Sequence, residues 1–121
     1  MPKILVVDDS MVNVKLVRES LKLEGFTIIE ANSGSEALKK AAREKPEAIF
    51  LDIRMADING VDVMKKLKAT PGFEKTPMIA ITACNMEGDR ETLLAEGFDD
   101  YISKPVSLME LLEKAKKYCP R

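Results

Sequence analysis

Carboxylates occupy the positions where apolar runs of this chain end. KILVVD closes on Asp8, followed by Asp9, and AIFLD closes on Asp52, while Thr82 and Lys104 follow two later runs. The chain contains no histidine, and its two cysteines lack metal-ligand spacing, so oxygen donors of this kind favour a hard cation such as Mg²⁺. A carboxylate beside Mg²⁺ and a lysine is also what an aspartyl nucleophile needs to attack phosphorus. This residue set therefore predicts phosphoryl-transfer chemistry.

Short apolar runs alternate with longer amphipathic ones, which is typical of βα units around a parallel sheet. Solid runs such as ILVV at 4–7 indicate strands covered by helices on both faces, as in a doubly wound α/β fold. The first helix is expected near 11–24, with Gly25 as its C-terminal cap. We expect strands at 3–8, 27–31, 48–52, 77–82 and 100–103. The later helices are expected to start at Ser33 or Ser35, at Asn59-Gly60, near Glu87-Gly88-Asp89, and at a Ser107/Glu110 capping box.

The carboxyl ends of parallel strands share one edge, so the polar residues above are expected to converge there. Two like charges about 5 Å apart repel by roughly 3 kcal/mol at an effective dielectric near 20. Three carboxylates would give about 10 kcal/mol as an upper bound, which is comparable with a domain's whole stability of about 5–15 kcal/mol. Lys104 supplies one positive charge, and protonation or a bound cation must supply more. The structural alternative is that each acid only caps a helix, but Thr82 and Lys104 at the same edge favour a site.

Composition narrows the function classes. The 121 residues are 45% hydrophobic and 32% charged with a net charge of −1, as expected for a single globular domain. The mixed charges leave no basic stripe for nucleic acid, and the apolar runs are too short to cross a membrane. We therefore expect a cytoplasmic protein with reduced thiols at Cys84 and Cys119.

Over its whole length the chain resembles the receiver domains of two-component response regulators. The resemblance implies one domain over 1–121, with a flavodoxin-like five-stranded sheet in the order 2-1-3-4-5 and helices on both faces. The chain would be a stand-alone receiver or a part of a longer regulator or hybrid kinase. The matching residues are Asp8-Asp9 after ILVV, Asp52, Gly60, Thr82-Ala83, Gly97 and Tyr101-Ile102-Ser103-Lys104-Pro105.

The same resemblance implies a role for each site residue. Asp52 would accept a phosphoryl group from a histidine kinase or phosphotransfer protein. Mg²⁺ would be held by Asp9, Asp52 and the backbone carbonyl of Arg54, with Asp8 reaching it through water. Lys104 would contact the phosphoryl group.

Two further residues would form the switch together with Lys104. Thr82 would be the switch hydroxyl and Tyr101 the switch aromatic, and the bond before Pro105 is a candidate cis peptide. Phosphorylation would shift the surface of the fourth helix, fifth strand and fifth helix, where a downstream protein would bind. The chain would be a signalling switch that assists only its own phosphorylation and dephosphorylation, and no enzyme.

Two alternatives come from other classes. A haloacid-dehalogenase-type phosphatase also uses a strand-end aspartate with Mg²⁺, but it needs a second aspartate where this chain has Arg54. A pseudo-receiver would have lost phosphate acceptance, against which the complete acid, Thr82 and Lys104 set argues. After Asp52 the chain has Met55-Ala56-Asp57 where the family often has a proline, which predicts a looser loop, while Asn59 can still cap the third helix. The sequence leaves open what Arg54 and Cys84 do to the lifetime of the phosphoryl group.

Overall fold

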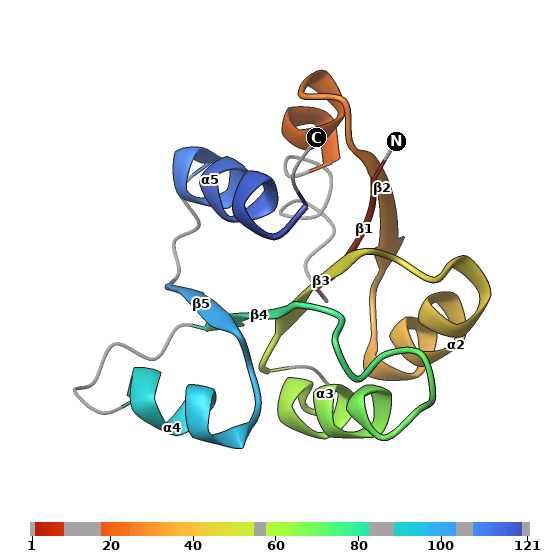
Figure 1. Cartoon of the computed structure of the whole chain (residues 1–121), viewed down its shortest axis with the longest axis vertical. Coiled ribbons are helices and arrows are strands. Elements are labelled where there is room, and N and C mark those ends of the chain that lie inside the picture. The colour runs from red at the N-terminus through yellow and green to blue at the C-terminus, as the bar shows by residue number, and fades with distance from the viewer. Residues whose placement is uncertain (1, 9–17, 55–57, 83–88, 104–107, 120–121) are drawn as a thin grey trace.

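The five predicted strands form one parallel sheet in the computed structural model of the chain, which describes residues 2–8, 18–54, 58–82, 89–103 and 108–119. The strands lie in the order β2-β1-β3-β4-β5, as predicted (Figure 1). Each neighbouring pair is parallel, so all carboxyl ends meet at one edge. The strands are β1 (Lys3–Val7), β2 (Thr27–Ala31), β3 (Ala48–Asp52), β4 (Met78–Thr82) and β5 (Asp100–Ser103).

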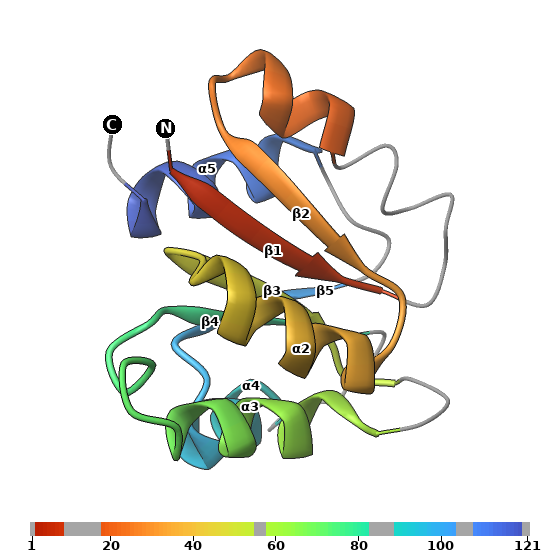
Figure 2. The same cartoon turned by 90° about the vertical axis from the view of Figure 1, so that its right-hand side faces the viewer.

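Helices cover both faces of the sheet. The face with Leu5, Val7, Ile49 and Leu51 packs against α2 (Gly34–Glu44), α3 (Gly60–Lys68) and α4 (Asp89–Glu96). The opposite face packs against helical residues 18–23 and α5 (Leu108–Tyr118), and Figure 2 shows these two layers on either side of the sheet. The central strands β3 and β4 are buried along their whole length, which explains their unbroken apolar runs.

Helix boundaries follow the local capping signals. Ser33, rather than Ser35, caps α2 by accepting a hydrogen bond from Glu36 N at 3.2 Å. Asn59 caps α3 in the same way, accepting from Asp62 N at 2.9 Å. Gly25 follows the helix of residues 18–23 with φ of 90°, the conformation that favours glycine. The fourth helix begins at Asp89, within its predicted start, while Glu87, Gly88 and the predicted cap Ser107 lie outside the described residues.

No helix among the described residues is long and apolar enough to cross a lipid bilayer. The predicted strand at 77–82 begins one residue later, at Met78, and that at 3–8 ends one residue earlier, at Val7. Neither difference moves a polar strand-end residue away from the carboxyl edge.

Candidate functional site

Asp8 directly follows β1, and Asp52 ends the neighbouring strand β3 at the carboxyl edge. Val7 of β1 pairs with Leu51 of β3, so the next residue on each strand is one of these two acids. Both are buried, with exposed fractions of 3% for Asp8 and 1% for Asp52. Two carboxylates in adjacent buried positions are costly unless positive charge or hydrogen-bond donors meet them. The structure therefore brings together two of the predicted acids at a place where a cation would be stabilised.

Hydrogen bonds fix the chain directly after Asp52. The backbone N–H of Arg54 donates to Asp52 Oδ1 at 3.1 Å, while the N–H of Ile53 donates to the carbonyl of Ile81 at 3.0 Å. The N–H of Gly60 then donates to the carbonyl of Ile53 at 2.8 Å, so the start of α3 closes on the end of β3. The Arg54 side chain is exposed. The main chain of Arg54 therefore lies against the acid, while its guanidinium group extends into solvent.

Gly60 is held against the main chain of Asp52. A Cβ atom added at Gly60 would stand 2.5 Å from the carbonyl oxygen of Asp52 and 2.9 Å from Cα of Ile53. These neighbours are backbone atoms at the end of a buried strand, so they have little room to move. The sequence marks Gly60 as the start of a helix, but only the structure shows that the close approach requires a residue without a side chain.

The predicted switch residues Thr82 and Tyr101 lie on the neighbouring strands β4 and β5. Asp52 pairs with Ile81, which places Thr82 one position further along the neighbouring strand, and Thr82 is 3% exposed. Tyr101 is half-buried and packs against the cluster under α3 and α4. Thr82 pairs with Ser103, after which the chain continues to Lys104. The Thr82 hydroxyl therefore lies at the carboxyl edge next to β3, whereas Tyr101 pairs with Ala80, two positions before Thr82.

Several predicted residues lie outside the described part of the chain. They are Asp9, Met55-Ala56-Asp57, Cys84, Lys104 and Pro105, and their predicted roles stay predictions. Among the described residues, no group of three or more histidine, cysteine, aspartate or glutamate side chains is placed to hold a metal. Asp8, Asp52 and the backbone carbonyl of Arg54 are the described members of the predicted ligand set. Their oxygen-only chemistry and the burial of the two acids at adjacent positions fit a hard divalent cation.

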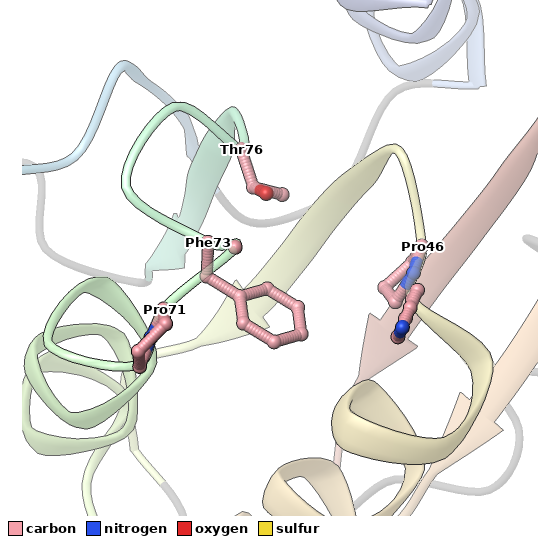
Figure 3. Close-up of a pocket in the computed structure, with 6 residues that line it drawn as sticks. Pro46, Pro71, Phe73 and Thr76 are labelled. Carbon is pink, nitrogen blue, oxygen red and sulfur yellow. The ribbon is translucent and has the colours of Figure 1, made fainter.

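A separate hollow of about 180 Å³ lies at the opposite edge of the sheet. Figure 3 shows Phe73 between Pro71 and Pro46, in the loops that precede β4 and β3. These loops lead into the amino ends of the two strands, whereas the acids end β1 and β3 at the carboxyl edge. The hollow is therefore not part of the predicted site.

Sequence reasoning missed a second acidic group, at the start of β5. Asp100 is 8% exposed and accepts hydrogen bonds from Tyr101 N at 2.8 Å and from the Tyr118 hydroxyl at 3.0 Å. Lys114 Nζ lies 2.8 Å from the same carboxylate. Burial alone would raise the pKa of Asp100, but the hydrogen bonds from Lys114, from the Tyr101 N–H and from Tyr118 together hold its pKa below the ordinary value of 3.8. This acid thus stays charged and fastens α5 to β5.

The fold and the acidic edge together define a class: a doubly wound α/β protein with buried carboxylates at the carboxyl ends of its central strands. Comparison with known proteins narrows the class to a family. Residues 4–116 match the response regulator receiver domain. The chain belongs to this family, the receiver domains of two-component signalling.

Individual relatives match over nearly the whole chain. The chain is 37% identical to the polar-differentiation response regulator DivK of Brucella anthropi over 119 residues, 98% of this chain and 97% of that protein. The structure of the chemotaxis protein CheY4 of Vibrio cholerae has a TM-score of 0.90 at 26% identity and covers 98% of each chain. The receiver domain of sensor histidine kinase PA1611 of Pseudomonas aeruginosa, with a magnesium ion coordinated in its active site cleft, has a TM-score of 0.87 at 30% identity. That match covers 97% of this chain and 96% of that one.

Proposed function

We propose that the chain, as a single receiver domain over residues 1–121, is a phosphoacceptor switch in which Asp52 takes a phosphoryl group from a histidine kinase or phosphotransfer protein. The observation that carries this proposal is the burial of Asp52 and Asp8 side by side at the carboxyl ends of β3 and β1. The hydrogen bond from Arg54 N to Asp52 Oδ1 holds one carboxylate oxygen. A carboxylate oxygen of Asp52 would attack phosphorus, with the departing imidazole nitrogen of the donor's phosphohistidine in line.

Mg²⁺ is the cation that the donor set fits best. Asp9, Asp52 and the Arg54 carbonyl would bind it directly, and Asp8 would bind it through water. The magnesium ion in the cleft of the similar PA1611 receiver domain supports this assignment. When bound, the ion offsets the charge that the carboxylates and the phosphoryl oxygens bring together. Lys104 would add a second positive charge on the phosphoryl group, directly after Ser103 at the end of β5.

The phosphoryl group would act through charge and hydrogen bonding. It replaces one negative charge on Asp52 with nearly two and adds three strong acceptors. Thr82, buried at the end of β4, would donate its hydroxyl to one of these oxygens. Tyr101, half-buried on β5, would turn into the space that Thr82 leaves. The surface of α4, β5 and α5 would then shift its population toward a form that binds a downstream protein.

Labelling with a small acyl phosphate donor and Mg²⁺ tests the acceptor. We expect the wild-type chain to take up the label and Asp52→Asn to take up none, since an amide cannot attack phosphorus as a carboxylate does. Asp100→Asn is the matched control because it removes a buried aspartate at the opposite edge, and it should label normally. Retained labelling in Asp52→Asn would refute the assignment.

Lys104→Ala tests the switch separately from acceptance. We expect this variant to accept phosphate but to show smaller NMR shift changes over α4, β5 and α5 on activation, because the ammonium no longer joins β5 to the phosphoryl group. Shift changes equal to those of the wild type would contradict the switching role. The lysine would then serve only to balance charge.

Two further measurements separate the proposal from its alternatives. Turnover of a panel of phosphate monoesters would instead indicate a phosphatase, whereas a receiver domain only dephosphorylates itself. A Mg²⁺ titration without any binding would indicate a pseudo-receiver. We expect Mg²⁺ binding and no turnover of monoesters, in a cytoplasmic protein that binds neither nucleic acid nor membrane by this chain alone.

A further inference from the structure

Strand β2 forms an edge of the sheet that no described element pairs with. The order β2-β1-β3-β4-β5 places it outermost, and Figure 2 shows it beneath the helix of residues 18–23. Thr27 N donates to the carbonyl of Pro2, and the carbonyl of Ala31 accepts from Asp8 N. Residues along a parallel strand alternate in the direction of their main-chain groups, so Thr27, Ile29 and Ala31 face β1. Ile28 and Glu30 therefore direct their main-chain groups away from the sheet.

The main-chain groups of the two outward-facing residues, Ile28 and Glu30, differ in whether a partner strand can bind them. The carbonyl of Glu30 accepts a hydrogen bond from Lys40 Nζ at 2.5 Å, and Lys40 also pairs with Glu36 at 3.1 Å. This lysine occupies the outer edge at one end of β2, as charged residues often do on exposed strands. Ile28 lies two residues before Glu30, beyond the part of the edge that Lys40 occupies. Its N–H and carbonyl form a short donor and acceptor pair at the open part of the edge.

A hollow of about 220 Å³ lies directly beside Ile28, lined by Arg18, Lys22, Phe26, Thr27 and Ile28. Phe26 is fully buried at its base, and Ile28 packs against the same apolar cluster. Lys22 makes no ion pair with any residue that the structure describes. The next residue, Leu23, has an exposed fraction of 87%. A hollow with an apolar base and a cationic group thus lies beside Ile28, and an exposed leucine follows that cation in the sequence.

We propose that this edge pairs with the same edge of a second copy of the chain, around a two-fold axis at Ile28. A donor and acceptor on one residue are self-complementary, because two antiparallel copies of Ile28 can exchange both hydrogen bonds. Only Ile28 of each copy takes part in this antiparallel hydrogen bonding. The Glu30 carbonyl already binds Lys40, and Phe26 N already donates to the carbonyl of Leu21 at 3.2 Å.

Charge complementarity supports a second copy as the occupant. In an antiparallel pair centred on Ile28, Glu30 of one copy lies opposite Phe26 of the other. The Glu30 side chain lies on the face covered by the helix of residues 18–23, since its carboxylate pairs with Arg18 at 3.3 Å. That position brings the carboxylate to the hollow of the second copy, beside its Lys22. The two-fold axis repeats this ion pair, and each Leu23 lies next to a Lys22 that takes part in it.

A ladder of a single residue pair buries little surface, so the dimer is expected to be weak and concentration-dependent. Sedimentation velocity of the unphosphorylated chain, up to about 1 mM, measures it directly. Ile28→Pro removes the outward N–H and leaves the hydrogen bonds to β1 intact, as proline at an exposed edge position can. We expect Ile28→Pro and Leu23→Glu to be monomeric. Met109→Glu, which alters a 74% exposed methionine on α5, should dimerise like the wild type.

Charge exchange keeps the test decisive if the proline variant does not fold. Lys22→Glu and Glu30→Lys should each weaken the dimer by about tenfold, and the double variant should restore it, because opposite charges again face each other across the axis. A chain that stays monomeric throughout would overturn the proposal, even if it captured an added extended peptide at Ile28. The proposal would also be overturned if Ile28→Pro, Leu23→Glu and both charge reversals left the dimer affinity unchanged.

Discussion

Gly60→Ala tests whether the close approach of α3 to β3 positions the acceptor loop. The added Cβ would stand 2.5 Å from the Asp52 carbonyl oxygen, while Cβ contacts below 3.0 Å are essentially never observed, so at least about 0.5 Å of separation must be gained. The atom that obstructs it is main chain rather than a side chain that can rotate. The start of α3 or the end of β3 must therefore move.

The cost follows from the hydrogen bonds that such a shift strains. They are Gly60 N to the carbonyl of Ile53 at 2.8 Å and Ile53 N to the carbonyl of Ile81 at 3.0 Å, each contributing about 1 kcal/mol net. Inserting atoms into a tightly packed place costs about 1–3 kcal/mol. Alanine recovers at most about 1 kcal/mol of helix propensity. We expect Gly60→Ala to lower the free energy of unfolding by about 1–2 kcal/mol.

Urea unfolding measures this loss as a lower midpoint with an unchanged slope. Gly72→Ala is the control because a Cβ there meets no atom within 4 Å, although its φ of 99° imposes a backbone penalty of its own. Only Gly60→Ala should also slow acyl phosphate labelling, since only that shift moves the Asp52 main chain. A Gly60→Ala variant with wild-type stability and labelling rate would refute the reasoning.

Two predictions concern the ion-paired start of β5. Asp100→Asn should lower the free energy of unfolding at neutral pH by about 1–3 kcal/mol because Lys114 loses its carboxylate partner. Since folding lowers the pKa of Asp100, this difference should persist above about pH 4 and shrink as the pH falls through the folded pKa. Urea unfolding at several pH values measures it. Tyr118→Phe should cost about 1 kcal/mol through the lost hydroxyl donor. Burial and the Asp100 carboxylate raise the pKa of Tyr118 to about 12. The hydroxyl should therefore contribute fully to the free energy of unfolding below about pH 10, and its contribution should disappear toward pH 12. A stability difference between Tyr118→Phe and wild type that is constant with pH would contradict this role of the hydroxyl.

The fold could be predicted from the sequence because its signals are local. An unbroken apolar run such as residues 48–51 requires cover on both faces, and both faces of β3 are buried. Asn59 and Ser33 cap their helices through residues three positions away, well within the range that a sequence pattern specifies. The position of Asp52 at a shared edge followed from the parallel order of strands. Local sequence patterns, combined with the known topology of parallel α/β sheets, therefore predicted the strand order and the position of Asp52 correctly.

Contacts between distant segments could not be predicted in this way. Asp100 meets Lys114 and Tyr118 only because α5 folds back over β5. An acid beside a tyrosine eighteen positions further along the chain has no sequence signature. The same holds for Gly60 against Asp52 and for the hollow beside Ile28. These features depend on how close two elements lie, which packing decides and periodicity does not.

The two buried acids of the sheet differ in how their charge is balanced. Asp100 has Lys114 at 2.8 Å, a partner built into the chain, so its charge is permanently compensated and serves to hold α5. Asp52 accepts its described hydrogen bond from a neutral main-chain N–H, that of Arg54. In the proposed function its charge is balanced partly by a cation that can leave. A charge balanced reversibly can respond when a phosphoryl group arrives, whereas one balanced by a fixed lysine cannot. Burial alone therefore does not distinguish the two acids, whereas the proposed function would distinguish them by the nature of the compensating charge.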